Sequence, residues 1–198
     1  MAEDFFEIFN TPIGIHLFSK NYFDVGTTAM LKFHKLCRDG DFSETNLVPL
    51  ATVAAINIAF ATELAIKGIY LHCTGKFVDK KIGHQLETIF SLLPKPIQEE
   101  IKVKTNASKR KKFISISLSG GNFKHISDYK KDTPDFERNL DIHNNSFLIF
   151  RYLFEHRNSS KQIIHFDFDF MNSFTQNVII KLNKIIQSKT FTSSQSPA

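Results

Sequence analysis

The chain has no tryptophan and only two cysteines, Cys37 and Cys73, among its 198 residues. Two cysteines are too few for the disulfide framework of a small secreted domain, and their spacing is not that of a metal site. Both fall within helical sequence patterns. We therefore expect two buried thiols in a reducing compartment, and no metal or other cofactor.

A secretory signal and a clear membrane span are also missing from the sequence pattern. The N-terminus, MAEDFFEIF, is acidic where a signal peptide is basic. The longest apolar stretch, residues 47–71, contains Asn57, Glu63 and Lys67, and charged residues are costly in a bilayer. We therefore expect a cytoplasmic protein with no membrane partner, in which this stretch is the central helix of a soluble bundle.

Phenylalanine, by contrast, is abundant: the chain has 21, against four tyrosines. The composition is otherwise that of a globular domain, with 42% hydrophobic and 23% charged residues. A chain of this length buries a sizeable core, which many of the phenylalanines must fill, while others are available for a self-association surface. The net charge of +5 favours anionic partners slightly.

Hydrophobic periodicity predicts a mainly α fold, an up-and-down helical bundle with one short extended segment. The predicted helices cover residues 15–37, 48–72, 84–93, 97–108, 136–156 and 171–187. Alternating residues predict a strand or an extended arm near 162–169, while 112–121 fits either a helix or a short extended run. Residues 119–135 form the longest predicted loop.

The same pattern predicts how the chain divides. Residues 1–14 are expected to be a loosely attached lead that ends at a Pro/Gly break. Residues 15–188 form one helical domain, and the polar residues 189–198 form a disordered tail.

Three sequence blocks stand in a characteristic order. They are AFATELAIKGIYLHCTG at 59–75, KIGHQLETIFSLLP at 81–94 and SFLIFRYLFE at 146–155. A helix with E-L-x-x-K, a loop with G-H-x-L and a later helix with R-Y-x-x-E together resemble the HEPN superfamily (higher eukaryotes and prokaryotes nucleotide-binding), over about residues 45–157. The resemblance implies an HEPN-like bundle of four or five helices, usually dimeric. Many members are RNases of toxin–antitoxin or antiviral systems, and others are non-catalytic modules for binding or dimerisation.

The RNase members carry an arginine, a polar neighbour and a histidine after four to six residues, and RNLDIH matches with Arg138, Asn139 and His143. The resemblance implies a metal-independent endoribonuclease of a toxin–antitoxin or phage-defence system. His143 would be the acid and base, Arg138 would stabilise the phosphorane and Asn139 would position the phosphate or the imidazole. Arg151 and His156 form a weaker match.

Geometry adds a condition to this interpretation. Arg138 and His143 are about 140° apart on one helix, so one copy does not aim both at one phosphate. Two copies of the helix, antiparallel across the two-fold axis of a homodimer, would bring both pairs into one cleft.

Two other interpretations stay open. Relatives with an intact R-Y-x-x-E block often lack the catalytic motif, which implies a non-catalytic module that binds a nucleotide or a partner protein. Its expected binding residues are Glu63, Lys67, His84, Arg151, Tyr152 and Glu155. Glu63 and Lys67 have the i,i+4 order that favours a helical ion pair. The third interpretation is a structural dimerisation domain with a Phe-rich surface.

The densest basic segment is KVKTNASKRKK, residues 102–112. Lys109, Arg110, Lys111 and Lys112 are expected to recruit RNA through its phosphates; the alternative is a solvated helix end. The expected partners are therefore RNA or a nucleotide, a second copy of the chain, and an antitoxin or defence-system protein.

Overall fold

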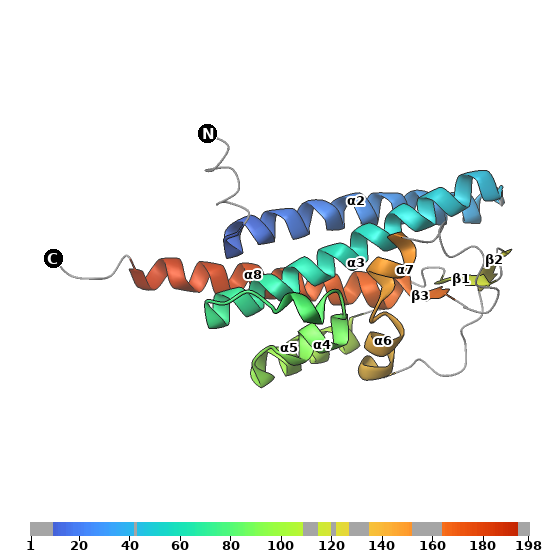
Figure 1. The fold of residues 1–198 in the computed structure, drawn as a ribbon. Coiled ribbons are helices and arrows are strands. Elements are labelled where there is room, and N and C mark those ends of the chain that lie inside the picture. Colours follow the sequence, from blue (N-terminus) through green and yellow to red (C-terminus); the bar gives the residue numbers. More distant parts are fainter. Residues whose placement is uncertain are drawn as a thin grey trace.

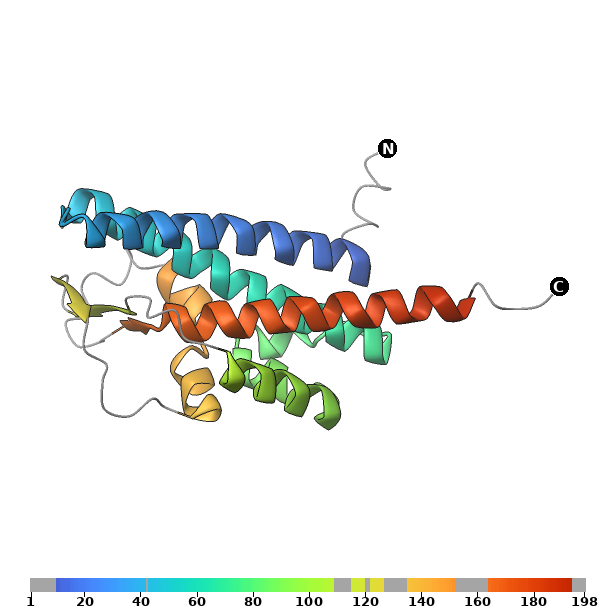
Figure 2. The same ribbon diagram turned by 180° about the vertical axis from the view of Figure 1, so that it is seen from behind.

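The computed structural model describes residues 10–41, 43–108, 115–119, 122–126, 135–151 and 164–193. Over these residues the fold is mainly α, as predicted. Three long helices lie side by side: α2 (Pro12–Arg38), α3 (Glu44–Thr74) and α8 (Phe168–Ser193) (Figure 1). Seen from behind, α8 runs along the bundle beside both of the others (Figure 2).

Helix α3 is the centre of the bundle because it is apolar on nearly all sides. Its buried residues pack against α2, α7 and α8. They include Ala54, Ala55, Ile58, Ala59, Ile66 and Ile69, all 0% exposed. The helix ends at Gly75, whose φ of 70° allows its N–H to cap the Leu71 carbonyl at 2.8 Å.

Shorter elements cover one flank of the long helices. In chain order they are η1 (Lys80–Ile82), α4 (Leu86–Ser91), α5 (Lys95–Ala107), α6 (Phe136–Ile142) and α7 (Ser146–Arg151). Helix α4 contacts α3 and α6, and α5 contacts α6 and α8. Helix α7 lies against α3.

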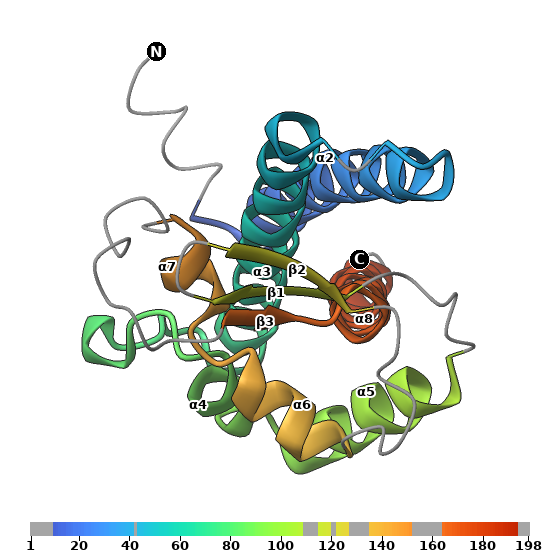
Figure 3. The same cartoon turned by 90° about the vertical axis from the view of Figure 1, so that its right-hand side faces the viewer.

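A three-stranded antiparallel sheet lies at one end of the bundle, where α2 ends and α8 begins (Figures 1 and 3). Its strands are β1 (Ser115–Ser119), β2 (Asn122–Ile126) and β3 (Ile164–Phe166), in the order β2-β1-β3. The predicted extended segment near 162–169 is therefore present, although α8 already begins at Phe168. Residues 112–121 contain a strand, and the predicted loop 119–135 contains β2.

The prediction of one helix over residues 136–156 is wrong. Helix α6 ends at Ile142, a turn follows, and α7 begins at Ser146. Asn144 in the turn accepts the Leu86 N–H through its backbone carbonyl at 3.0 Å and the Glu87 N–H through Oδ1 at 2.9 Å. The break thus satisfies amides at the start of α4, and residues 152–156 lie outside the described residues.

Three smaller predictions also need correction. Pro12 begins α2 and does not end a loose lead, because the Thr11 side chain caps the Gly14 N–H at 3.0 Å and proline suits a first helical position. Helix α8 continues to Ser193, into the predicted disordered tail. Cys37 is buried as predicted, but Cys73 is exposed.

One helix among the described residues is long and apolar enough to cross a membrane by length and composition alone. This segment, Asn46–Thr74, has a mean hydropathy of 1.7. Within the structure 56% of its most apolar window is buried, and the helix packs against α2, α7 and α8.

Helices α2 and α3 approach closely at Gly26. A β-carbon there would lie 2.8 Å from Ile58 Cγ1, 3.0 Å from the Ile58 backbone nitrogen and 3.2 Å from the Ala54 carbonyl oxygen. Because two of these atoms belong to the backbone of α3, the helices must separate to admit a methyl group.

Gly26→Ala should therefore destabilise the protein more than Gly68→Ala. At Gly68 a β-carbon would meet only side-chain ends, Leu182 Cδ2 at 2.8 Å and Ile15 Cγ2 at 2.9 Å, which can rotate away. Overpacking at Gly26 should cost about 1–3 kcal/mol of stability. Replacing glycine by alanine stabilises a helix by up to about 1 kcal/mol, and this gain is the same at both sites. Urea unfolding measures the difference, and equal stabilities would contradict the close approach at Gly26.

An ion triad joins α5 to α8. The Glu100 carboxylate accepts hydrogen bonds from Lys104 on its own helix and from Lys181 on α8. These two bonds lower the pKa of Glu100 from its ordinary value of 4.5 to about 2. Since the pKa is lower in the folded state, the triad stabilises fully above pH 4.5, and this contribution is lost as the pH falls towards 2.

Glu100→Gln should lower the free energy of unfolding at pH 7 by about 1 kcal/mol, a value reduced for solvent screening of this partly exposed group. The difference in the free energy of unfolding between the variant and the wild type should be smaller at pH 3 than at pH 7. Urea unfolding at both pH values measures it, with the exposed Glu99→Gln as the control. A gap that stays constant with pH would show that the triad does not stabilise the fold.

Candidate functional site

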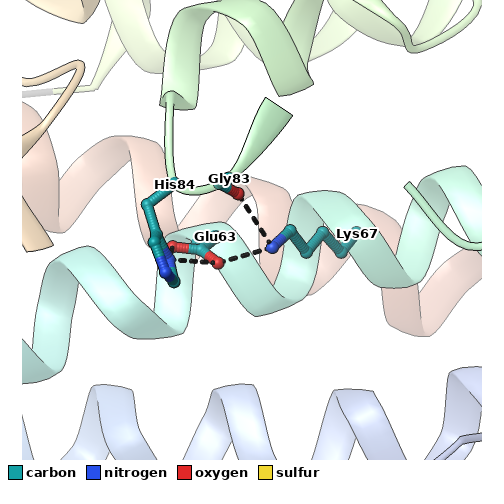
Figure 4. A network of polar contacts seen from close by, with 4 residues as sticks. All are labelled: Glu63, Lys67, Gly83 and His84. Atoms are coloured by element: carbon teal, nitrogen blue, oxygen red, sulfur yellow. Dashed lines mark hydrogen bonds and ion pairs between the residues drawn. The ribbon is translucent and has the colours of Figure 1, made fainter. Parts of the chain in front are cut away.

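An acidic side chain lies inside the apolar central helix. Glu63 of α3 is 2% exposed, and desolvating a carboxylate costs on the order of several kcal/mol unless cations compensate it. Lys67, one turn along α3, donates from Nζ to Glu63 Oε1 at 2.7 Å. His84 Nδ1 lies 2.9 Å from Oε1 and 2.8 Å from Oε2 (Figure 4). Both oxygens of the buried carboxylate are thus occupied.

The loop between α3 and α4 is shaped to make this contact. Asp79 caps the start of η1, where its Oδ1 accepts the Lys81 N–H at 2.8 Å, and Gly83 follows the last residue of η1 as its C-cap. Gly83 has a φ of 63°, a backbone conformation that disfavours a β-carbon. Its carbonyl accepts a hydrogen bond from Lys67 Nζ at 3.1 Å (Figure 4). Lys67 therefore joins the loop backbone to the carboxylate.

Helix α7 adds an aromatic ring and a guanidinium group. Phe147 stacks on Phe60 of α3, with ring centroids 4.8 Å apart, and its centroid lies 5.0 Å from that of His84. Arg151, one turn further along α7, places Cζ 5.7 Å from the Phe147 centroid, within cation–π distance. We call Glu63, Lys67, His84, Phe147 and Arg151 the Glu63 cluster.

The Glu63 cluster turns its acid inwards and its basic groups outwards. The side chains of Lys67 and His84 are 29% and 35% exposed, and Arg151 is exposed. Two of the three Lys67 N–H groups have partners, and His84 Nε2 has no hydrogen-bond partner among the described residues. When His84 is protonated, Nε2 becomes a donor, and the cluster then offers charge-assisted donors to an anion.

The structure thus gathers four of the residues that the sequence predicted for ligand binding: Glu63, Lys67, His84 and Arg151. They come from α3, the loop before α4, and α7. Tyr152 and Glu155, the other two, lie outside the described residues.

The predicted catalytic residues do not form a common exposed site. His143 is 0% exposed: Nδ1 donates to the Asn139 carbonyl at 2.6 Å, and Nε2 accepts the Asp167 N–H at 2.9 Å. A carbonyl only accepts and an amide only donates, so these partners fix a neutral ring with its proton on Nδ1. Asn139 is 2% exposed, while Arg138 is exposed.

This arrangement does not support the catalytic roles expected of these three residues, and those roles stay predictions. Both nitrogens of His143 are occupied by the protein's own backbone, and the Asn139 amide donates to the Asp135 carbonyl at 3.1 Å. Pairing two copies across an axis would not bring His143 to the surface, because it is enclosed within its own chain by α6, β3 and α8.

The basic segment 102–112 is only partly described. Lys102 pairs with Glu137, and Lys104 pairs with Glu100, so these two ammonium groups are neutralised by neighbours. Lys109, Arg110, Lys111 and Lys112 lie outside the described residues.

Phe60 and the Gly83 carbonyl also belong to the site, although neither was predicted for it. Phe60 could have been found from helical spacing, because it lies three residues before Glu63 and seven before Lys67 on one face of α3. No local signal identifies the Gly83 carbonyl, since its role depends on how the loop folds back onto α3.

Among the described residues, no group of three His, Cys, Asp or Glu side chains could hold a metal ion. Comparison of the chain with models of protein families, with curated proteins and with solved structures finds no match. The geometry of the Glu63 cluster is therefore the basis of the functional proposal.

His143→Ala should destabilise the protein by about 2–5 kcal/mol, because it removes the ring that accepts the Asp167 N–H and donates to the Asn139 carbonyl, and it opens a cavity. Arg138→Ala, at an exposed position, should change stability by no more than about 0.5 kcal/mol. Urea unfolding of both variants measures the contrast. Wild-type stability in the His143 variant would contradict its structural role.

Proposed function

We propose that the protein is a cytoplasmic, non-catalytic HEPN-like module that binds the phosphate of a nucleotide or an RNA at the Glu63 cluster. The observation that carries this proposal is the pairing of Lys67 and His84 with one buried carboxylate, beside the Phe147 ring over which Arg151 lies. Three basic side chains from separate elements accompany a single acid there.

The buried carboxylate prepares the cluster for an anion. Glu63 holds Lys67 and His84 by hydrogen bonds of 2.7–2.9 Å, so a ligand does not have to order these side chains on binding. Because both Glu63 oxygens already accept hydrogen bonds, its charge is compensated locally. The remaining Lys67 N–H and the second ring nitrogen of His84 can then meet phosphate oxygens, and Arg151 adds a guanidinium group over the neighbouring Phe147 ring.

The burial of His143 is the reason to propose binding without the RNase chemistry of other HEPN proteins. A general acid or base must reach the proton that it moves, and both ring nitrogens of the buried His143 already bond to backbone groups of its own chain. The expected homodimer and the expected antitoxin or defence-system partner stay predictions.

The test is titration of the purified protein with adenosine 5′-monophosphate, followed by calorimetry. Arg151→Met should weaken binding about tenfold or more, because a hydrogen bond to a charged group contributes about 1.5–3 kcal/mol. His84→Gln should also weaken binding, because it removes the imidazole ring from the cluster.

Lys32→Met is the matched control, because Lys32 is an exposed lysine of α2 outside the cluster. It should bind the nucleotide as the wild type does. If Arg151→Met binds as tightly as Lys32→Met, or if the wild type does not bind the nucleotide, the cluster is not a phosphate site.

A further inference from the structure

The loop between α3 and α4 carries an exposed aromatic ring among lysines. Phe77 is 61% exposed, whereas most of the other phenylalanines whose side chains the structure describes are buried in the core. Lys76, Lys80 and Lys81 are exposed on the same loop. The one acid between them, Asp79, directs its carboxylate to the Lys81 backbone N–H at 2.8 Å.

These three lysines have no carboxylate partner among the described residues. Ion pairs neutralise five lysines elsewhere: Lys20, Lys67, Lys102, Lys104 and Lys181. The loop therefore keeps uncompensated positive charge at its surface, and such a surface attracts anions.

Lys80 and Lys81 are also continuous along the backbone with the Glu63 cluster. The Gly83 N–H donates to the Lys80 carbonyl at 3.1 Å, and the Gly83 carbonyl accepts from Lys67 Nζ at 3.1 Å. With a rise of about 2 Å per residue in a 3₁₀ turn, the backbone of Lys80 and Lys81 lies within about 6 Å of Gly83 along the chain. A ligand held at the cluster would reach this loop with its next phosphate groups.

We propose that the loop of residues 75–84 binds single-stranded nucleic acid: Lys76, Lys80 and Lys81 bind successive phosphates, and Phe77 stacks on a base. This inference rests on the proposed function, since the Glu63 cluster would hold one phosphate of the same strand. It extends the ligand from a mononucleotide to a strand of several nucleotides.

The single exposed ring favours a single strand over the other polyanions. In a duplex the bases are already stacked, and Phe77 would have no π-face to meet. A membrane anchor needs more buried apolar surface than one aromatic side chain provides. Stacking on an unpaired base uses one ring and is indifferent to sequence.

The test is fluorescence anisotropy with labelled oligouridine and oligodeoxythymidine of about eight nucleotides, a length within the range of known single-strand sites. The triple variant Lys76→Gln/Lys80→Gln/Lys81→Gln should bind more weakly. The slope of log affinity against log salt should fall by about 2, because each phosphate contact to a single strand contributes about 0.7. Phe77→Ala should weaken binding about tenfold and leave the salt slope unchanged.

The controls remove equal charge or equal apolar surface elsewhere. Lys32→Gln/Lys35→Gln/Lys184→Gln replaces three exposed lysines outside the loop, and Leu31→Ala truncates a side chain that is 52% exposed. Both should bind as the wild type does. Equal losses in the loop variant and in its charge-matched control would overturn the proposal, since binding would then depend only on net charge.

Adenosine 5′-monophosphate separates this inference from the proposed function. If the protein binds adenosine 5′-monophosphate and binds the oligonucleotides no more tightly, the loop proposal is overturned and the cluster stays a phosphate site. Oligonucleotide binding that depends on the loop, in a protein that does not bind the nucleotide, would support the loop and overturn the cluster. Loop-dependent binding to phosphatidylserine vesicles, with none to oligonucleotides, would overturn the loop proposal in favour of a membrane surface.

Discussion

The compensation of one buried carboxylate is the constraint on which the rest of this structure depends. Helix α3 is apolar on nearly all sides, and Glu63 at 2% exposure is the acid within it. A carboxylate so placed requires cations at hydrogen-bond distance. Lys67 is available on the same helix, but His84 must be brought by the loop, which needs the turn at Gly83. The fold of the loop and the geometry of the candidate site thus follow from the same interaction.

A second set of contacts directs α7 to this carboxylate. His143 joins the end of α6 to the start of α8 through the Asp167 N–H, and Asn144 caps the start of α4. These bonds hold the turn between α6 and α7, so that α7 leaves it towards α3 and Phe147 meets Phe60. The histidine that a catalytic motif singles out is therefore a structural residue that positions Phe147 and Arg151, and its burial is a requirement of that role.

The mainly α fold could be predicted from the sequence because the spacing of apolar residues along a helix is a local signal. Helices α2, α3 and α8 are long enough to show that spacing clearly. The sequence also predicted Glu63, Lys67 and His84 together, through their spacing and their blocks. The break between α6 and α7 was missed because apolar residues continue beyond it from Phe147, and only the polar Asn144 region indicates a turn. Burial of His143 could not be predicted, since the spacing of arginine and histidine does not show which face a helix turns to the core.

The distribution of ion pairs explains why net charge is a poor guide to where this protein would meet an anion. The densest basic segment of the sequence begins at Lys102, yet Lys102 and Lys104 are neutralised by Glu137 and Glu100. The Lys102 pair joins α5 to α6 and the Lys104 pair lies within α5, and composition reveals neither of them. The shorter basic loop before α4 has no such acid facing it in the described structure, because its own Asp79 caps η1. Positive charge available to an anion at the surface therefore depends on which lysines the fold leaves without a carboxylate partner, and net charge alone does not show this.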